Sequence, residues 1–470
     1  FFNCMIMAAV NLAAVKIAGI LFGLPRWQTL TGIGLLNVAF AAHSGLWGVL
    51  VIDMIQFFIK MSAVVAAAYF ALHAPQVGGL HGLMDKLQHT SGPGGLNYLS
   101  ILPDFKSNWD LAVAVFIMPV AVQWWAVWYP GSEPGGGSYI AQRMLASKSE
   151  KDALGAVLFF NVAHYVLRPW PWILVALASI VVYPQLSDIQ HAFPNLDPKL
   201  LGHDIAYPAM LTFLPAGFLG LMVGGLVAAN SSTILTHLNW GASYLVHDFY
   251  RRFIKTDATE SHYVLVGRLA TVFLFLASSA TVYLMDSAKD TFDIILQIGA
   301  GTGLLYLVRW YWWRVNAWCE VVAMTSSLLV SVGLLVASKN GVHMSPHLAL
   351  PLTVVVTTIC WVATAYLAPQ TDRQTLISFY KKVRPSGPGW NEIREAAKLT
   401  PAEAAETHTN IAEALLGWSA ACSMIWSALF TIGTFLYGRY TQTMLLFVVF
   451  VISTAIVVRV MKTLWPEPTA

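Results

Sequence analysis

Three residues that can offer oxygen atoms lie on one face of an apolar segment near the middle of the chain. The segment, residues 217–253, is long and mostly apolar, so we expect a helix. Ala229, Ser232 and Thr233 are three and four positions apart and would share one face of it. Their backbone carbonyl and two hydroxyls would supply part of the shell of a sodium ion. The alternative is that the hydroxyls join neighbouring helices, as Ser and Thr often do in membranes.

A second stretch, residues 128–143, reads WYPGSEPGGGSYIAQR and breaks an apolar run with glycine and proline. The residues of interest around it are Trp124, Trp125, Trp128, Tyr129 and Glu133. Irregular backbone inside a membrane is tolerated only where it lines a cavity or is buried in protein. We therefore expect residues 129–137 to be non-helical and these side chains to border a substrate cavity. The alternative is a loop just outside the bilayer, with the aromatic residues at the membrane interface.

Charged side chains within apolar spans need partners, because a charge at the bilayer centre costs at least about 2.5 kcal/mol. Lys16, Lys60 and Arg168 lie in such spans, and Glu133 lies in the break. We predict an ion pair between Glu133 and Arg168 that braces the broken helix. The alternative is that one of the two contacts substrate. Lys60 is expected to snorkel or to pair inside the helix bundle.

The composition indicates an all-α integral membrane protein. Hydrophobic residues make up 57% of the 470 residues and charged residues 11%, whereas soluble domains carry about 25% charged residues. A net charge of +3, with the basic residues in short loops, gives no reason to expect a nucleic-acid partner. Membrane lipid and a small-molecule substrate are the expected partners, and the sequence does not indicate partner subunits.

Signs of enzymatic chemistry are missing from the sequence, so we do not expect an enzyme. We find no Walker loop, dinucleotide fingerprint or metal-ligand spacing. The four cysteines are scattered in or beside apolar spans and show neither disulfide nor zinc spacing.

Twelve apolar spans are predicted, and the loops between them alternate in charge. The spans lie near 1–22, 27–46, 49–73, 109–129, 153–183, 213–246, 261–285, 291–311, 316–337, 347–368, 409–436 and 442–463. One set of loops holds most of the Lys and Arg, and by the positive-inside rule this set is cytoplasmic. Residues 369–408 then form a cytoplasmic loop, residues 74–108 lie outside, and both chain ends lie inside. We expect a multi-pass protein of the bacterial inner membrane.

The first residues, FFNCMIMAAVNLAAVKIAGILFGLP, are already inside an apolar span, without a charged leader or an initiator methionine. This start indicates that the beginning of the protein is missing.

Four motifs resemble those of the sodium/solute symporter family, and they occur in that family's order over about residues 1–320. AANSSTILTHLNWGASYLVHDFY resembles the family signature that ends in Asp-aromatic-Tyr, and GGGSYIAQRMLASKSEKDA resembles its Gln-Arg motif after the broken helix. HSGLWGVLVIDMIQ resembles the Gly-Gly-Leu-Trp element, although His43-Ser44-Gly45 replaces the usual double glycine. RWYWWRVNAWCE resembles the Trp-Arg-x-Asn turn.

The resemblance implies the leucine-transporter fold, in which two inverted five-helix repeats rock around a site at the membrane midplane. The first span here would be the third core helix, the broken span the sixth, and residues 217–250 the eighth. Residues 1–311 would then form the transporter core, without its first two helices. Residues 312–470 would add further C-terminal transmembrane helices around the cytoplasmic loop 369–408.

The resemblance also implies roles for single residues. A sodium ion would bind the backbone carbonyl of Ala229 and the hydroxyls of Ser232 and Thr233. Asp53 and Thr236 match a second sodium site of some members, but Leu235 replaces one of its hydroxyls, so a single coupling sodium is our prediction. Asp53 would otherwise be a relay, or an acid at a helix start.

Lys16 would project from a helix that borders the substrate cavity, where it could meet a substrate carboxylate. The implied function is sodium-coupled symport of a small polar solute. Aromatic residues at the break suit a sugar, whereas Lys16 suits an amino acid or a carboxylate. The alternative is a membrane sensor or structural subunit that keeps the fold without transport. A channel is a third reading, but the chain lacks a repeated filter sequence.

Overall fold

The chain is described here from a computed structural model that covers residues 2–40, 46–92, 95–122, 125, 144–285, 288–342, 344–385, 387–400 and 411–464. These residues are helical apart from turns, loops and two isolated β-bridges, Ser91–Asn97 and Trp312–Gly389. The expectation of an all-α protein is confirmed for this part of the chain.

Nine helices in the described ranges are long and apolar enough to cross a membrane. They account for nine of the twelve predicted spans. The other three predicted spans correspond to a shorter helix at Arg26–Phe40 and to the shorter apolar helices Trp109–Ala121 and Gln297–Val308. The chain is therefore a multi-pass membrane protein, and the count of twelve stays a prediction.

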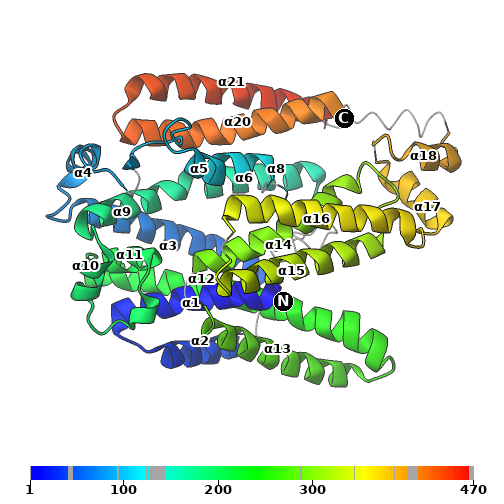
Figure 1. Ribbon diagram of the computed structural model, residues 1–470, viewed down its shortest axis with the longest axis horizontal. Helices are drawn as coiled ribbons and strands as arrows, with labels where there is room; N and C mark the ends of the chain where they lie inside the picture. Colours follow the sequence, from blue (N-terminus) through cyan, green and yellow to red (C-terminus); the bar gives the residue numbers. More distant parts are fainter. Residues whose placement is uncertain are drawn as a thin grey trace. The chain divides into compact units, whose positions relative to one another are not determined.

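The described helices group into two compact units, each treated by itself. The first contains residues 1–99 and 168–292. Its elements are α1 (Phe2–Phe22), α2 (Arg26–Phe40), α3 (Leu46–Leu72), α4 (Gly79–Gln88), α9 (Pro169–Val182), α10 (Leu186–Ala192), η5 (Pro198–Leu200), η6 (His203–Ile205), α11 (Ala206–Leu211), α12 (Ala216–Ser243), η7 (Tyr244–Ile254) and α13 (Glu260–Val282). Helix α12 packs against α1, α3 and α13 (Figure 1). Its buried side is the one with Ile234 and Leu238, which pack with Met7 of α1 and Leu274 of α13.

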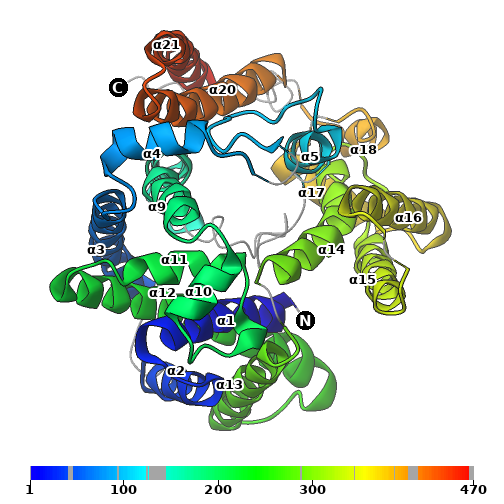
Figure 2. The same ribbon diagram turned by 60° about the vertical axis from the view of Figure 1, so that its left-hand side comes forward.

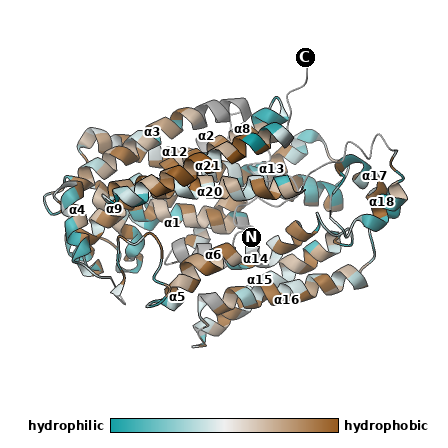
Figure 3. Cartoon of the chain, turned by 90° about the horizontal axis from the view of Figure 1, so that it is seen from above, coloured by the Kyte–Doolittle hydropathy of each residue, from teal (hydrophilic) through white to brown (hydrophobic). Residues whose placement is uncertain are grey.

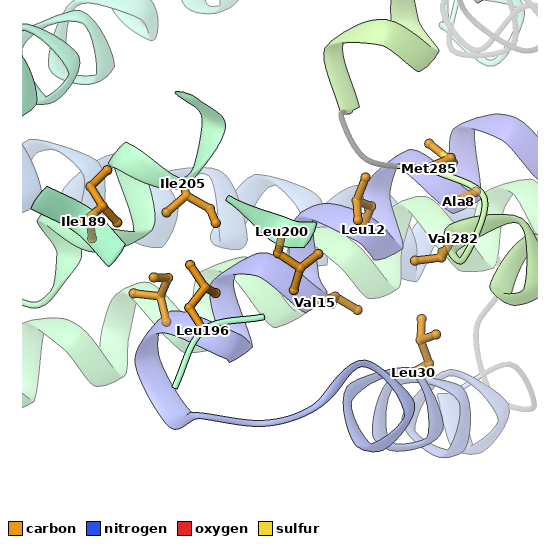
Figure 4. Close-up of a cluster of buried hydrophobic side chains, with 12 residues drawn as sticks. Ala8, Leu12, Val15, Leu30, Ile189, Leu196, Leu200, Ile205, Val282 and Met285 are labelled. Atoms are coloured by element: carbon orange, nitrogen blue, oxygen red, sulfur yellow. The ribbon is translucent and has the colours of Figure 1, made fainter. Parts of the chain in front are cut away.

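A buried apolar cluster fastens the segment 184–214 to the end of α1. Leu12 and Val15 of α1 pack with Leu196, Leu200 and Ile205 of that segment (Figure 4). Apolar residues at three- and four-residue spacing on α1 form the stripe that this cluster requires. As a result, α10, η5, η6 and α11 cover one end of the unit as a packed layer.

The turn between η7 and α13 is fixed by side chains on both sides. The hydroxyl of Thr259 accepts a hydrogen bond from the backbone N–H of His262, which caps α13. The hydroxyl of Tyr263 donates to the carbonyl of Lys255 at 2.7 Å, and Arg251 pairs with Glu260 at 3.2 Å. This turn is one of the basic loops that the charge pattern predicts to be cytoplasmic.

The second unit contains residues 100–167 and 293–470. Its elements are α5 (Trp109–Ala112), η2 (Val113–Ile117), α6 (Met118–Ala121), α8 (Glu150–Asn161), η4 (Val162–Leu167), most of α14 (Ala288–Val308), α15 (Ala317–Lys339), α16 (Pro346–Leu367), α17 (Arg373–Val383), α18 (Asn391–Ala397), α20 (Ile411–Leu436) and α21 (Tyr440–Leu464). Helices α20 and α21 form an antiparallel hairpin, and α15 packs on α16 (Figure 2).

The long helices are predominantly hydrophobic, whereas α17 and α18 carry many hydrophilic residues (Figure 3). Both short helices lie in the loop 369–408 that the sequence predicts to be cytoplasmic. The predicted division of the chain at residue 311 follows the expected roles of the helices rather than their packing. It stays a prediction.

Candidate ion and substrate site

The predicted sodium-binding residues lie together on the uninterrupted helix α12. The hydroxyl of Thr233 donates to the carbonyl of Ala229 at 3.0 Å, so two of the three predicted oxygens are already adjacent. Ala229, Ser232 and Thr233 are all half-buried. A hydroxyl that donates one hydrogen bond keeps its lone pairs as an acceptor, so the Thr233 oxygen can still face a cation. The arrangement offers neutral oxygens, the kind of ligand that a hard cation prefers.

The opposite face of α12 is also polar, and it is held by α1. Asn230 donates from Nδ2 to the carbonyl of Val10 at 3.5 Å, and Asn230 and Ser231 are both buried. Asn230 and Ser231 point away from Ala229 because successive residues on a helix are about 100° apart around its axis. The sequence pattern identified the face with Ala229 but did not identify Asn230 as the contact that anchors it.

Of the two residues of the predicted second sodium site, the structure describes the side chain of Thr236 but not that of Asp53. The hydroxyl of Thr236 donates to the carbonyl of Ser232 at 2.9 Å, one turn along the ion-binding face. Asp53 lies in α3, near its start, and its side chain is outside what the structure describes. A second ion therefore stays a prediction.

Lys16 has a carboxylate partner within its own chain. Its Nζ donates to both oxygens of Asp204 in η6, at 2.8 Å each. The Lys16 side chain is 3% exposed and that of Asp204 is 35% exposed. A second cation, Arg26, lies 3.7 Å from Asp197 in the same segment. The sequence pattern did not identify Asp204, because its partner lies 188 positions away.

Arg168 contacts an aromatic ring that the sequence analysis did not single out. It lies at the start of α9, and its guanidinium carbon is 4.4 Å from the ring centre of Trp172, a cation–π contact. The predicted partner Glu133 is outside the described residues, so the Glu133–Arg168 ion pair stays a prediction. Lys60 donates to Gln56 one turn earlier on α3, at 3.2 Å.

Most of the predicted break cannot be placed. Trp124, Trp128 and Tyr129 lie outside the described part of the chain, together with the rest of 126–143. Trp125 is described and half-buried, and it packs with Leu350 and Val354 of α16. A role for these aromatic side chains in a substrate cavity stays a prediction.

Comparison with known proteins places these features in a wider group. A model of the sodium:solute symporter family matches residues 1–328. The sodium/glucose cotransporter of Vibrio parahaemolyticus is 25% identical over 339 residues, which cover 68% of this chain and 60% of that protein. The sodium/myo-inositol cotransporter 2 of Bos taurus is 26% identical over 309 residues, covering 60% of this chain and 44% of that protein. The chain thus spans less than two thirds of the length of either relative.

A solved structure gives an independent likeness in fold. It shows the substrate-bound outward-open state of a Na+-coupled sialic acid symporter. The two chains superpose with a TM-score of 0.53 at 17% identity, covering 79% of this chain and 75% of the other. At this identity the likeness concerns the arrangement of helices alone.

Proposed function

The chain belongs to the sodium:solute symporter family, and from this premise we propose that it forms a large part of a sodium-coupled symporter for a small polar organic solute. The observation that carries the proposal is the family match over residues 1–328, which contains the whole of α12. The family resemblance read from four sequence motifs is confirmed by that match. Transport moves the solute without changing it chemically, so no catalytic residue is proposed.

Sodium is the co-transported ion of the proposal, and α12 carries its binding residues. Ala229 contributes its carbonyl, and Ser232 and Thr233 contribute their hydroxyls. The adjacency of the Ala229 and Thr233 oxygens supports this assignment. When sodium binds, the Thr233 hydroxyl gives up or shares its hydrogen bond to Ala229, at a cost of about 1 kcal/mol. The ion's own interactions offset that cost.

The driving force of the proposed cycle is the sodium gradient together with the membrane potential. One positive charge moving inward gains about 2.3 kcal/mol per 100 mV of negative-inside potential. Alternating access of inverted repeats would expose the site to each side in turn. A coupling of one sodium to one solute is the simplest arrangement that these residues support.

The solute is proposed to be a sugar, an amino acid or a carboxylate. The relatives are named for glucose and myo-inositol, and the structural neighbour for sialic acid. These names favour a polyhydroxylated solute. The aromatic residues around the break would suit the apolar face of a sugar ring. Lys16 offers less support for a carboxylate solute, because Asp204 already neutralises its charge.

Transport is tested with the full-length protein in proteoliposomes. We expect labelled glucose, myo-inositol, sialic acid or an amino acid to accumulate when sodium is higher outside. A negative-inside potassium diffusion potential should accelerate the uptake. Replacing sodium by potassium, or dissipating the gradient, should reduce uptake to the level of protein-free vesicles. A folded protein that moves no solute in the panel, or moves one equally well in potassium, would contradict the proposal and favour a sensor or structural subunit.

The proposed location is the inner membrane of a bacterium, with the basic loops in the cytoplasm. The bacterial source of one relative and the positions of Lys and Arg support it. In a variant without the four natural cysteines, we expect Lys148→Cys and Gln374→Cys to be protected from an impermeant maleimide in intact cells. Asn195→Cys, in the segment 184–214, should react, because this loop holds few Lys and Arg and the alternation of loops then places it outside. All three positions are exposed. The reverse labelling pattern would invert the topology.

A further inference from the structure

Helices α17 and α18 form a small unit that is held close to the ends of membrane helices. Helix α16 ends at Leu367 and α17 begins at Arg373, so only residues 368–372 join them. A fully extended chain of that length reaches no more than about 20 Å. The unit therefore cannot move far from the end of α16, which is long and apolar enough to cross a membrane.

The unit is also tied to the end of α14. Trp390 donates from Nε1 to the carbonyl of Arg309 at 3.2 Å, and Trp390 packs in a buried cluster with Trp313. A Cβ at Gly387 would collide with the backbone of Tyr311, so only glycine allows this approach. These contacts fix the unit against the turn that joins α14 to α15.

Exposed aromatic residues gather at the same helix ends. Trp310, Tyr311, Trp318 and Tyr366 are 41%, 48%, 56% and 64% exposed. Tryptophan and tyrosine gather where hydrocarbon meets headgroups, because their rings are apolar and their tips are polar. These aromatic residues support a position of the α17–α18 unit near the depth of the headgroups.

The last turn of α17 exposes two lysines and part of two apolar side chains. Its inner face is set by Leu376 and Tyr380, which are buried with Trp390. In the last turn Lys381 and Lys382 are exposed, and within the described chain they form no salt bridge. Phe379 and Val383 are 40% and 43% exposed and border the buried face, where the Phe379 ring lies 5.6 Å from that of Trp390. Lys382 is on their flank of the helix, and Lys381 is on the far side. Cations next to exposed apolar side chains are typical of helices that lie in a membrane interface.

Positive charges outnumber negative charges on this unit. The charged residues are Arg373, Lys381, Lys382, Arg384, Arg394 and Lys398, against Asp372, Glu392 and Glu395. The acids do not cancel the lysines at the end of α17. Asp372 is occupied at the opposite end, where it accepts hydrogen bonds from Thr375 that lower the pKa of its carboxyl. Glu392 and Glu395 are on α18.

We propose that the last turn of α17 binds the headgroups of anionic phospholipids. Lys381 and Lys382 pair with lipid phosphates, while Phe379 and Val383 enter the boundary between headgroups and acyl chains. A soluble acidic partner would satisfy the lysines but would leave the two apolar side chains exposed to water. The distance to the membrane and the apolar neighbours therefore favour lipid.

The test uses the full-length protein without its natural cysteines, with an environment-sensitive dye on Ser378→Cys, an exposed position of α17. The protein is placed in nanodiscs of phosphatidylcholine containing increasing fractions of phosphatidylglycerol. We expect a blue shift that grows with phosphatidylglycerol and is reversed by high salt, because screening weakens exposed charge pairs. With Lys381→Gln and Lys382→Gln, the fraction needed for half the shift should rise by roughly fivefold or more, since each lysine near an anionic surface contributes about 1 kcal/mol.

The control variant removes two other exposed charges, with Arg252→Gln and Lys255→Gln in the turn before α13. It should behave as the parent does. An equal shift in neutral and anionic nanodiscs would mean that apolar contact alone places the helix, and would overturn the proposal. The absence of a shift in both would overturn it as well, because the surface would then not face the membrane.

Discussion

Replacing Ser232 and Thr233 together by alanine is expected to raise the sodium concentration for half-maximal uptake at least about tenfold. A hydrogen-bond-type interaction with a charged group is worth about 1.5–3 kcal/mol, and the double variant removes two ligands of this kind. A factor of ten corresponds to only about 1.4 kcal/mol, so the expected change is conservative. The measurement is the initial rate of solute uptake against external sodium, with the potential held constant.

The control is Ser231→Ala on the opposite face of the same helix. Its hydroxyl is buried and has no protein hydrogen-bond partner in the described chain, so its removal should leave the sodium dependence unchanged. Thr236→Ala then distinguishes a mechanism with one coupled sodium ion from a mechanism with two. A change in the steepness of the sodium curve would indicate a second ion, whereas an unchanged curve would leave a single coupling sodium. If the double variant keeps the parent's sodium dependence, the assignment to Ala229, Ser232 and Thr233 is wrong.

The features that sequence predicted best depend on local periodicity. Ala229, Ser232 and Thr233 share a face because helical geometry fixes the direction of residues three and four apart. The structure accordingly brings the oxygens of Ala229 and Thr233 to 3.0 Å. Long apolar runs likewise predict the nine membrane-length helices of the described ranges, since a helix satisfies its own backbone hydrogen bonds within hydrocarbon.

Features that depend on distant parts of the chain were not predictable in the same way. The sequence indicates that Lys16 needs a partner, because it lies in an apolar span, but nothing near it in sequence identifies Asp204. The cation–π contact of Arg168 with Trp172 likewise has no signal in the spacing of the sequence, whereas its predicted pair with Glu133 stays a prediction. Pairing of this kind is set by tertiary packing, for which a single sequence carries no spacing signal.

The packing of the turn between α17 and α18 against the end of α14 is another feature that depends on distant parts of the chain. The prolines and glycines of SFYKKVRPSGPGW are typical of a turn, and α17 is capped there by Arg384 with φ of 51°. The reason for the glycines lies elsewhere, because Gly387 and Gly389 allow the loop to approach Tyr311 and Trp312 closely. Local turn propensity was visible in the sequence, but the surface that the turn packs against was not.

The second large effect is expected at the buried ion pair between Lys16 and Asp204. Asp204→Asn should destabilise the protein by about 3 kcal/mol, because it leaves an ammonium group in a buried site without its counter-ion. The Lys16 side chain is 3% exposed, so water cannot replace the lost carboxylate without rearrangement. The measurement is the midpoint of thermal denaturation of the purified protein in detergent.

The reverse change should cost less. Lys16→Met leaves Asp204 without its cation, but 35% of that side chain is exposed and can be hydrated, so we expect a loss of about 1 kcal/mol. The double variant Lys16→Met with Asp204→Asn should be more stable than Asp204→Asn alone, because an apolar replacement of a whole buried pair is often close to neutral. Asp197→Asn is the matched control. The Arg26 side chain that it leaves behind is 12% exposed, and the contact is 3.7 Å rather than 2.8 Å, so we expect a smaller loss than for Asp204→Asn.

The same variants decide whether Lys16 binds substrate. If the pair is structural, the denaturation midpoint of Asp204→Asn should be lower than that of Lys16→Met. The double variant should then have a higher midpoint than Asp204→Asn. Uptake by each variant should be proportional to the amount of folded protein. A substrate-binding lysine predicts a different result. Lys16→Met would then raise the solute concentration for half-maximal uptake in a protein of normal stability. Adding Asp204→Asn would not lower that concentration again. Because Asp204 holds Nζ through both carboxylate oxygens at 2.8 Å, we expect the first result. Equal stability of all three variants would show that the pair does not fasten segment 184–214 to α1.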